Sequence, residues 1–298
     1  MADAPVKLSL MTGNYPNTQP LKSGKVTSSL VDLDFVDVKV ANQHFKAVVR
    51  EAKYDVSELA IVTFLQAKTY GKPYVLMPAV AVSRGQLQTI AYDGERGTMT
   101  PKDIAGKKVG VRAYTQTTGA WVRGILQEDY GVDVNGITWI TTEDPHLAEY
   151  QDPPGMVVRV ADDKSIPKMV LEGETVAAIV GDTIPDPRLK YLVADHEAAN
   201  KRYADKNGGV PINHMYVVRQ SLSKERPDVV REVFRMLVES AKQGVQPGTE
   251  MAAGVRFGVE ACRTSLERII DYSYKQKLIP RPFSVDELFD DTTRALKP

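Results

Sequence analysis

The chain has 298 residues, which predicts two lobes, because a single domain commonly holds about 100–150 residues. Hydrophobic residues make up 43% of it and charged residues 26%, as in other globular proteins, and 38 basic residues balance 38 acidic ones. The zero net charge argues against a nucleic-acid-binding protein, and no apolar run is long enough for membrane insertion.

Strand-like apolar runs alternate with amphipathic helical patterns along most of the chain, which predicts crossover units and a mostly parallel sheet. The expected strands are Lys7–Met11, Leu33–Val38, Val75–Ala81, Thr89–Tyr92, Lys108–Arg112, Ile137–Thr141, Val157–Val160, Val176–Val180 and Met215–Arg219. The expected helices are Glu58–Tyr70, Gly119–Tyr130, Ile166–Leu171 and Val229–Lys242. From Lys224 onward the patterns are helical only, and Ser284 with Glu287 predicts a capping box. We expect these last helices to pack back on the first lobe.

The strand expected at 108–112 is followed by a polar segment that leads into the next helix. This segment contains Tyr114, Thr115, Gln116, Thr117 and Thr118. Open α/β sheets bind ligands at the carboxyl ends of their strands, and the N–H groups of a first helical turn attract anions. We therefore expect the segment to bind a carboxylate. A simple N-cap by Thr117 or Thr118 is the alternative.

Other polar residues stand at expected turns and caps. Asn14 and Tyr15 follow the first strand, and Asp182 follows the strand 176–180. Ser57 and Glu58 stand at the start of the next expected helix, which Ser57 would cap. Each of these residues is a candidate ligand contact, and for each an ordinary structural role in a turn or cap is the alternative.

Two arginines and one histidine are candidates for the chemistry. Arg84 and Arg123 could hold a carboxylate, because a guanidinium group donates to both of its oxygens, although most arginines are solvated. His214 lies at the entry to the strand 215–219, where an imidazole could carry protons or serve a structural role.

The sequence offers no pattern for a cofactor or a metal. None of the four histidines has metal-ligand spacing, and phosphate-loop and dinucleotide-binding motifs are missing, so we expect neither a metal nor a cofactor. Cys262 is the single cysteine, which excludes an intramolecular disulfide. A buried structural thiol is its expected role, with a reactive thiol as the alternative.

Five segments together carry a resemblance to a known family. They read "KLSLMTGNYPNTQPLKSGKV", "YDVSELAIVTFLQAKTYGKP", "IAGKKVGVRAYTQTTGAWVRGILQEDYGVDVNGITW", "SIPKMVLEGETVAAIVGD" and "PINHMYVVRQSLSKERPDVVREVF". They resemble the 4,5-dihydroxyphthalate decarboxylase family over nearly the whole chain, and "WVRGILQEDYGV" is the most specific part. One departure is Gln86-Leu87, where the family usually has an Arg-His pair.

The resemblance implies an α/β protein of the two-lobe, type II periplasmic-binding-protein-like fold, with a ligand cleft between the lobes. Together with the Gly-rich "NGGVP", it implies a first lobe of residues 1–91 and 212–298 and a second lobe of residues 92–211. The expected hinges are Tyr92–Gly94 and Gly209–Ile212.

The resemblance also implies a cofactor-independent decarboxylase that acts in the degradation of hydroxylated aromatic acids of the phthalate type. His214 would supply the proton, residues 115–118 would hold the carboxylate and Arg123 would support it electrostatically. The alternative is a solute-binding protein of an ABC-type transporter, or a ligand sensor, that binds a small carboxylate without chemistry. Either function is compatible with a homo-oligomer.

The expected location follows from the start of the chain. No signal-peptide pattern precedes the first strand, which predicts a cytoplasmic protein. A signal peptide removed from the natural protein would instead mean the periplasm.

Overall fold

The computed structural model describes residues 4–161 and 163–298. Met1, the start on which the expected cytoplasmic location depends, lies outside the described residues. The chain forms two compact units. Unit 1 comprises the residues up to Arg84 together with Ile212–Arg268 and Pro282–Pro298, and unit 2 comprises Gly85–Pro211 and Ile269–Arg281.

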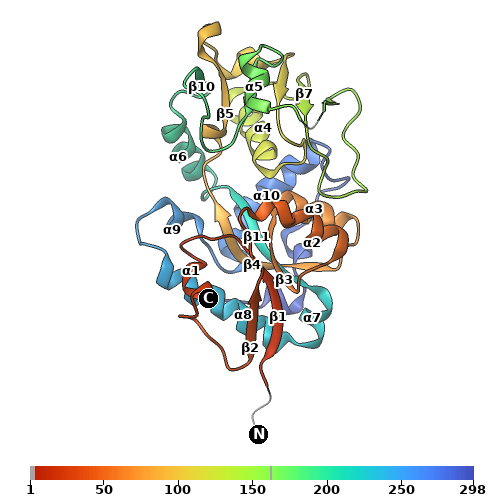
Figure 1. Ribbon diagram of the computed structural model, residues 1–298, viewed down its shortest axis with the longest axis vertical. Coiled ribbons are helices and arrows are strands. Elements are labelled where there is room, and N and C mark those ends of the chain that lie inside the picture. The colour runs from red at the N-terminus through yellow and green to blue at the C-terminus, as the bar shows by residue number, and fades with distance from the viewer. Residues whose placement is uncertain (1–3, 162) are drawn as a thin grey trace. The chain divides into compact units, whose positions relative to one another are not determined.

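Unit 1 contains a five-stranded sheet of order β2-β1-β3-β11-β4 (Figure 1). Its strands are β1 (Val6–Met11), β2 (Val31–Phe35), β3 (Val56–Ala60), β4 (Tyr74–Ser83) and β11 (Ile212–Arg219). β1 is parallel to both β2 and β3, whereas β11 runs antiparallel to β3 and β4. The returning strand β11 therefore lies inside the sheet, beside β3.

Helices complete unit 1. They are α1 (Gln19–Lys22), α2 (Phe45–Glu51), α3 (Ile61–Thr69), α7 (Gln220–Glu225), α8 (Pro227–Gly244), α9 (Glu250–Gly254), α11 (Asp291–Arg294) and the first part of α10 (Val259–Lys275). α8 buries Val229, Val233 and Leu237 in one apolar cluster with Leu10 and Val56 of the sheet. This packing places α8 against the first sheet.

Unit 2 contains a six-stranded sheet of order β10-β5-β9-β6-β7-β8. Its strands are β5 (Ile90–Asp93), β6 (Lys108–Gly110), β7 (Thr138–Thr141), β8 (Val157–Arg159), β9 (Ala177–Ile179) and β10 (Leu189–Tyr191). The central strands are parallel, while β5 is antiparallel to β9 and β10. Its helices are α4 (Thr117–Tyr130), α5 (Ile166–Leu171) and α6 (His196–Lys206), and Met169 and Val170 of α5 pack on Ile140 and Ala178.

The units differ from the expected lobes in two segments. Residues 269–281 were expected in the first lobe, but they belong to unit 2. Hydrogen bonds to α4 explain this difference. Tyr272 donates to Glu128, Gln276 donates to the carbonyl of Ala120, and both acceptors lie on α4. Residues 85–91, also expected in the first lobe, belong to unit 2 as well, and the chain returns to unit 1 at Ile212.

Two expectations for local structure were wrong. The helix expected from Glu58 begins only at Ile61, because residues 56–60 form β3. All five residues of β3 are buried between two neighbouring strands, and such a strand lacks the polar alternation that would distinguish it from a helix. Ser57 is therefore not a helix cap, and its hydroxyl donates to the carbonyl of Glu58 at 2.7 Å.

The second correction concerns the start of α4. Its N-cap is Gln116, and Thr117 and Thr118 are the first two helical residues. Gln116 has the extended backbone of a cap residue, with φ −58° and ψ 127°, but its side chain makes no capping hydrogen bond. The helix thus begins one residue earlier than it would with Thr117 as its N-cap.

Other expectations were confirmed. The capping box of Ser284 and Glu287 is formed at the start of a short 3-10 helix, Val285–Leu288. Cys262 is a free and fully buried thiol on α10, and burial raises its pKa to about 12. Within residues 4–161 and 163–298, the structure has no helix that is both long and apolar enough to cross a membrane.

Candidate functional site

Polar side chains end an otherwise apolar face of the sheet in unit 1. On that face Leu10, near the end of β1, pairs with Val56, the first residue of β3, and both belong to the apolar core. Two residues further along lie Thr12 and Glu58, and side chains two residues apart share a face of a strand. Glu58 pairs with Tyr216 of β11, so three neighbouring strands place polar groups in one row at this edge.

The centre of this row is the carboxyl group of Glu58, which is completely buried. Its Oε1 accepts hydrogen bonds from His214 Nδ1 at 2.6 Å and from the Tyr15 hydroxyl at 2.9 Å. Its Oε2 accepts from the backbone N–H of Gly13 at 2.8 Å and from the Thr12 hydroxyl at 3.0 Å. These four donors match the roughly four lone-pair sites of a carboxylate.

The hydrogen bonds decide the charge of Glu58. Burial alone would raise the pKa of its carboxyl group, because a low-dielectric environment disfavours the charged form. The hydrogen bond and positive charge of His214, together with the donors Gly13 and Tyr15, outweigh burial and lower the pKa below its usual value. Glu58 is therefore an acceptor-only carboxylate at neutral pH, and the His214 Nδ1 that contacts it must carry a proton.

The two neighbouring phenols stay neutral. Burial and the negative charge of Glu58 raise the pKa of both Tyr15 and Tyr216. Tyr216 also shares a hydrogen bond of 3.0 Å with the Thr12 hydroxyl, which links β1 to β11 across Glu58. Around one buried negative charge the site therefore gathers neutral hydroxyl donors and one imidazole.

His214 is, with Tyr15, one of the partly exposed members of this group. Its side chain is 21% exposed, whereas that of Glu58 is 0% exposed. The ring of Phe45 meets the imidazole edge to face, with ring centres 5.1 Å apart and planes at 89°. The imidazole is thus held on two sides, by a carboxylate at Nδ1 and by an aromatic ring.

One cation near this group was missed by sequence reasoning. Lys22 Nζ donates to the carbonyl of Thr12 at 2.7 Å and to Asn14 Oδ1 at 2.8 Å. Burial lowers the pKa of Lys22, although the charges of Glu58 and Asp37 act in the opposite direction. The signal available in the sequence was weak, because Lys22 lies on the single-turn helix α1, which no periodicity reveals.

In unit 2 the structure joins Tyr114 and Arg123. Arg123 is completely buried, with its guanidinium carbon 4.0 Å from the ring centre of Tyr114 and 5.1 Å from that of Trp139. Its Nε donates to Gln276 Oε1 and its Nη2 to the carbonyl of Tyr114, both at 2.7 Å. Burial lowers the pKa of this guanidinium group. Arg123 therefore supports the polar segment from the buried side. Nothing in the sequence indicated that its partner would be Gln276, which is 153 residues away.

The other expected residues fall into the two units as follows. In unit 1, Asn14 is exposed, Ser57 is buried in β3, and Arg84 is half-buried directly after β4. In unit 2, Thr115, Thr117 and Thr118 are buried, Gln116 is half-buried, and Asp182 is exposed beyond β9.

The departure at Gln86-Leu87 also has a clear setting in unit 2. Both side chains are buried, and both backbone N–H groups donate to Asn200 Oδ1, at 3.0 and 3.1 Å. The amide of Asn200 thus fixes this turn.

Among the described residues, no three His, Cys, Asp or Glu side chains are grouped as they would be to hold a metal ion.

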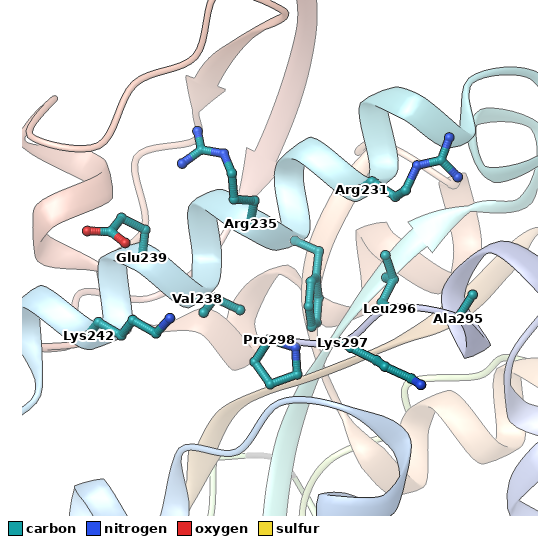
Figure 2. Close-up of a pocket in the computed structure, with 10 residues that line it drawn as sticks. Arg231, Arg235, Val238, Glu239, Lys242, Ala295, Leu296, Lys297 and Pro298 are labelled. Carbon is teal, nitrogen blue, oxygen red and sulfur yellow. The ribbon is translucent and has the colours of Figure 1, made fainter.

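A surface cavity of about 350 Å³ lies on unit 1, between α8 and the C-terminal residues (Figure 2). No residue expected in the site lines it. Figure 2 shows Arg231 and Arg235 extending away from Leu296 and Pro298, and Arg235 is paired with Glu232 at 2.8 Å. The cavity therefore has no convergent set of charged groups.

Comparison with known proteins tests the predicted resemblance. No family model matches the chain. It is 29% identical over 235 residues to a protein of Comamonas testosteroni named 4,5-dihydroxyphthalate decarboxylase. The matched segment covers 74% of this chain and 71% of that relative. A Pseudomonas putida protein of the same name is 28% identical over 207 residues, or 65% of this chain and 80% of the relative. The predicted resemblance is confirmed.

Solved structures show the fold. The alkanesulfonate-binding protein SsuA of Xanthomonas axonopodis pv. citri, bound to MOPS, superposes with a TM-score of 0.56 at 12% identity and covers 97% of this chain and 99% of its own. The desulfurization enzyme DSZB superposes with a TM-score of 0.51 at 12% identity, covering 96% and 97%. The two-lobe periplasmic-binding-protein-like fold is thereby confirmed, and it occurs in both a binding protein and an enzyme.

Proposed function

We propose that this chain is a cofactor-independent decarboxylase of a hydroxylated aromatic carboxylic acid of the phthalate type. Two relatives with good coverage carry the name of such an enzyme. The fold alone does not distinguish an enzyme from a receptor, because function depends on the site and not on the fold. The observation that carries the proposal is the His214–Glu58 pair, an accessible imidazole held at Nδ1 by a buried carboxylate.

The chemistry needs one proton donor and a source of electrons. An ortho or para hydroxyl oxygen supplies electrons to the ring, so that the ring carbon bearing the carboxylate can take up a proton as a keto-type intermediate, and protonated His214 is the proposed general acid. When carbon dioxide then leaves, the electron pair of the broken carbon–carbon bond returns to the ring and restores its aromatic character. After the proton transfer the imidazole is neutral and still donates Nδ1–H to Glu58.

In unit 2 we propose that the segment 115–118 binds a carboxylate of the substrate. The 14-residue helix α4 begins at Thr117, and the positive end of its dipole favours an anion there. Arg123 holds the carbonyl of Tyr114 and is fully buried, which supports an electrostatic and positioning role.

Other ligand contacts also remain part of the proposal. They are Asn14, Tyr15 and Arg84 in unit 1 and Asp182 in unit 2. Ser57 and Glu58 are both buried, which supports a role in holding their neighbours.

The second candidate is a binding protein or sensor for a small carboxylate, favoured by the likeness to sulfonate-binding proteins. The two functions call for different places in the cell. We propose the cytoplasm for the enzyme, whereas a transport receptor would work in the periplasm. Cell fractionation of the natural host separates these locations, and gel filtration decides whether the protein forms the homo-oligomer that both functions allow.

The deciding experiment follows carbon dioxide release from 4,5-dihydroxyphthalate, with unhydroxylated phthalate as the matched compound that cannot supply the electrons. We expect release from the first and none from the second. His214→Ala should lower turnover by about 10²–10⁴-fold with little change in binding, as expected for the loss of a general acid. His196→Ala, on α6 of unit 2, is the matched control and should leave turnover unchanged. Tight binding without carbon dioxide release from any hydroxylated phthalate would favour the receptor instead.

A further inference from the structure

We propose that Glu58 is the positioning residue of His214, which keeps a proton on Nδ1 and so makes Nε2 the nitrogen that exchanges a proton with the substrate. The inference rests on the proposed function for its catalytic consequence. Its structural part concerns the protein alone and can be tested without any substrate.

Contacts with the Gly13 loop keep the carboxylate of Glu58 turned toward His214. The backbone N–H of Gly13 can only donate, and it holds Oε2 at 2.8 Å. A β-carbon on Gly13 would lie 2.4 Å from the ring of Tyr15, so the ring packs directly over this glycine. With Oε2 fixed on this loop, Oε1 is left for the two side-chain donors.

One oxygen of Glu58, Oε1, contacts the imidazole. Oε1 accepts from both His214 Nδ1 and the Tyr15 hydroxyl, at 2.6 and 2.9 Å. An ionised oxygen offers both partners a lone pair, so neither has to accept. His214 therefore keeps Nδ1–H in its protonated and its neutral form, and Nε2 is the only ring nitrogen that changes its proton.

The proton balance of the reaction follows from this assignment. The imidazolium gives its Nε2 proton to the ring carbon, and a π electron pair of the ring forms the new carbon–hydrogen bond. The electron pair left by departing carbon dioxide restores the aromatic ring, and the neutral imidazole keeps Nδ1–H toward Glu58. Water then restores the Nε2 proton. Glu58 accepts the hydrogen bond from Nδ1 throughout and does not itself exchange a proton.

Glu58→Gln inverts this arrangement at constant size. The amide must direct its oxygen toward Gly13, which can only donate, so its NH₂ group faces His214 and Tyr15. A donor opposite Nδ1 makes that nitrogen an acceptor, and the neutral imidazole must move its proton to Nε2. The variant therefore predicts a reversed tautomer, which a merely structural role of Glu58 would not require.

The experiment is nitrogen-15 NMR of histidine-labelled protein, with His214→Asn used to assign the signals of His214. We expect the neutral ring to be protonated at Nδ1 in the wild type and at Nε2 in Glu58→Gln. In the decarboxylation assay, kcat should fall by about 10²-fold with little change in KM. The same tautomer in both proteins would overturn the proposal.

Tyr15→Phe is the second variant, which serves if Glu58→Gln does not fold. It removes the other donor to Oε1 and leaves the carboxylate in place, so His214 should keep the Nδ1–H tautomer. An Nε2–H tautomer in this variant would refute the role of Glu58. If the tautomers behave as expected but no hydroxylated phthalate loses carbon dioxide, the positioning role stands and the proposed function fails.

Discussion

Glu58→Ala tests whether the buried carboxylate holds the polar edge of unit 1 together. The truncation removes the acceptor of four hydrogen bonds inside a completely buried site. Thr12 keeps Tyr216 as a partner, and the half-buried Tyr15 and His214 can reach water, so the backbone N–H of Gly13 is the main group left without an acceptor. An unsatisfied buried donor costs about 1–3 kcal/mol.

Two further effects modify this cost. The missing side-chain atoms leave a small cavity, which adds on the order of 1 kcal/mol. Removing a buried charge relieves part of its desolvation, which offsets some of the loss. We therefore expect the free energy of unfolding to fall by roughly 2–4 kcal/mol.

The assay is urea unfolding followed by far-ultraviolet circular dichroism, because both tryptophans lie in unit 2 and their fluorescence would report that unit. Asp55→Ala is the matched control. Its carboxylate also accepts two hydrogen bonds, both from Ser9, but its side chain is 33% exposed. We expect this control to lose about 1 kcal/mol or less, since water can replace its contacts. An equal or larger loss for Asp55→Ala would refute the argument that burial sets the cost.

Two other predictions follow from the same structure. Thr117→Pro should leave the stability of α4 unchanged, because Thr117 is its first residue and Gln116 already has an extended backbone, but it removes an N–H group. Calorimetry should show weaker carboxylate binding, and undiminished affinity would remove this N–H from the site. The pH dependence of stability gives the second test. The pKa of Glu58 is lower in the folded chain than its usual value, so its contribution is complete above about pH 4.3 and is lost as the pH falls through the folded pKa. Glu58→Gln should therefore show a smaller loss of stability on acidification than the wild type, and equal acid sensitivity would contradict this assignment.

Much of the element order follows from local sequence. The strand run at the start of the chain, the helix Ile166–Leu171 and the capping box of Ser284 and Glu287 were all predicted from patterns of a few residues. These patterns act through neighbours in the chain, such as alternating burial or a hydroxyl that accepts from an N–H three residues on. The resemblance of whole segments then predicted the two-lobe fold.

Tertiary structure decided the elements whose surroundings come from distant parts of the chain. The sequence predicted a helix from Glu58, and only its position between β1 and β11 makes the segment 56–60 a strand. The site depends on the same packing, since Glu58 meets Thr12 across 46 residues and His214 across 156. Sequence reasoning selected Tyr15, Glu58 and His214 separately, but it had no means to predict that one oxygen of Glu58 holds the other two. Strand register, burial and the resulting charge state arise only when the sheet forms, because they depend on which groups the fold brings within hydrogen-bonding distance.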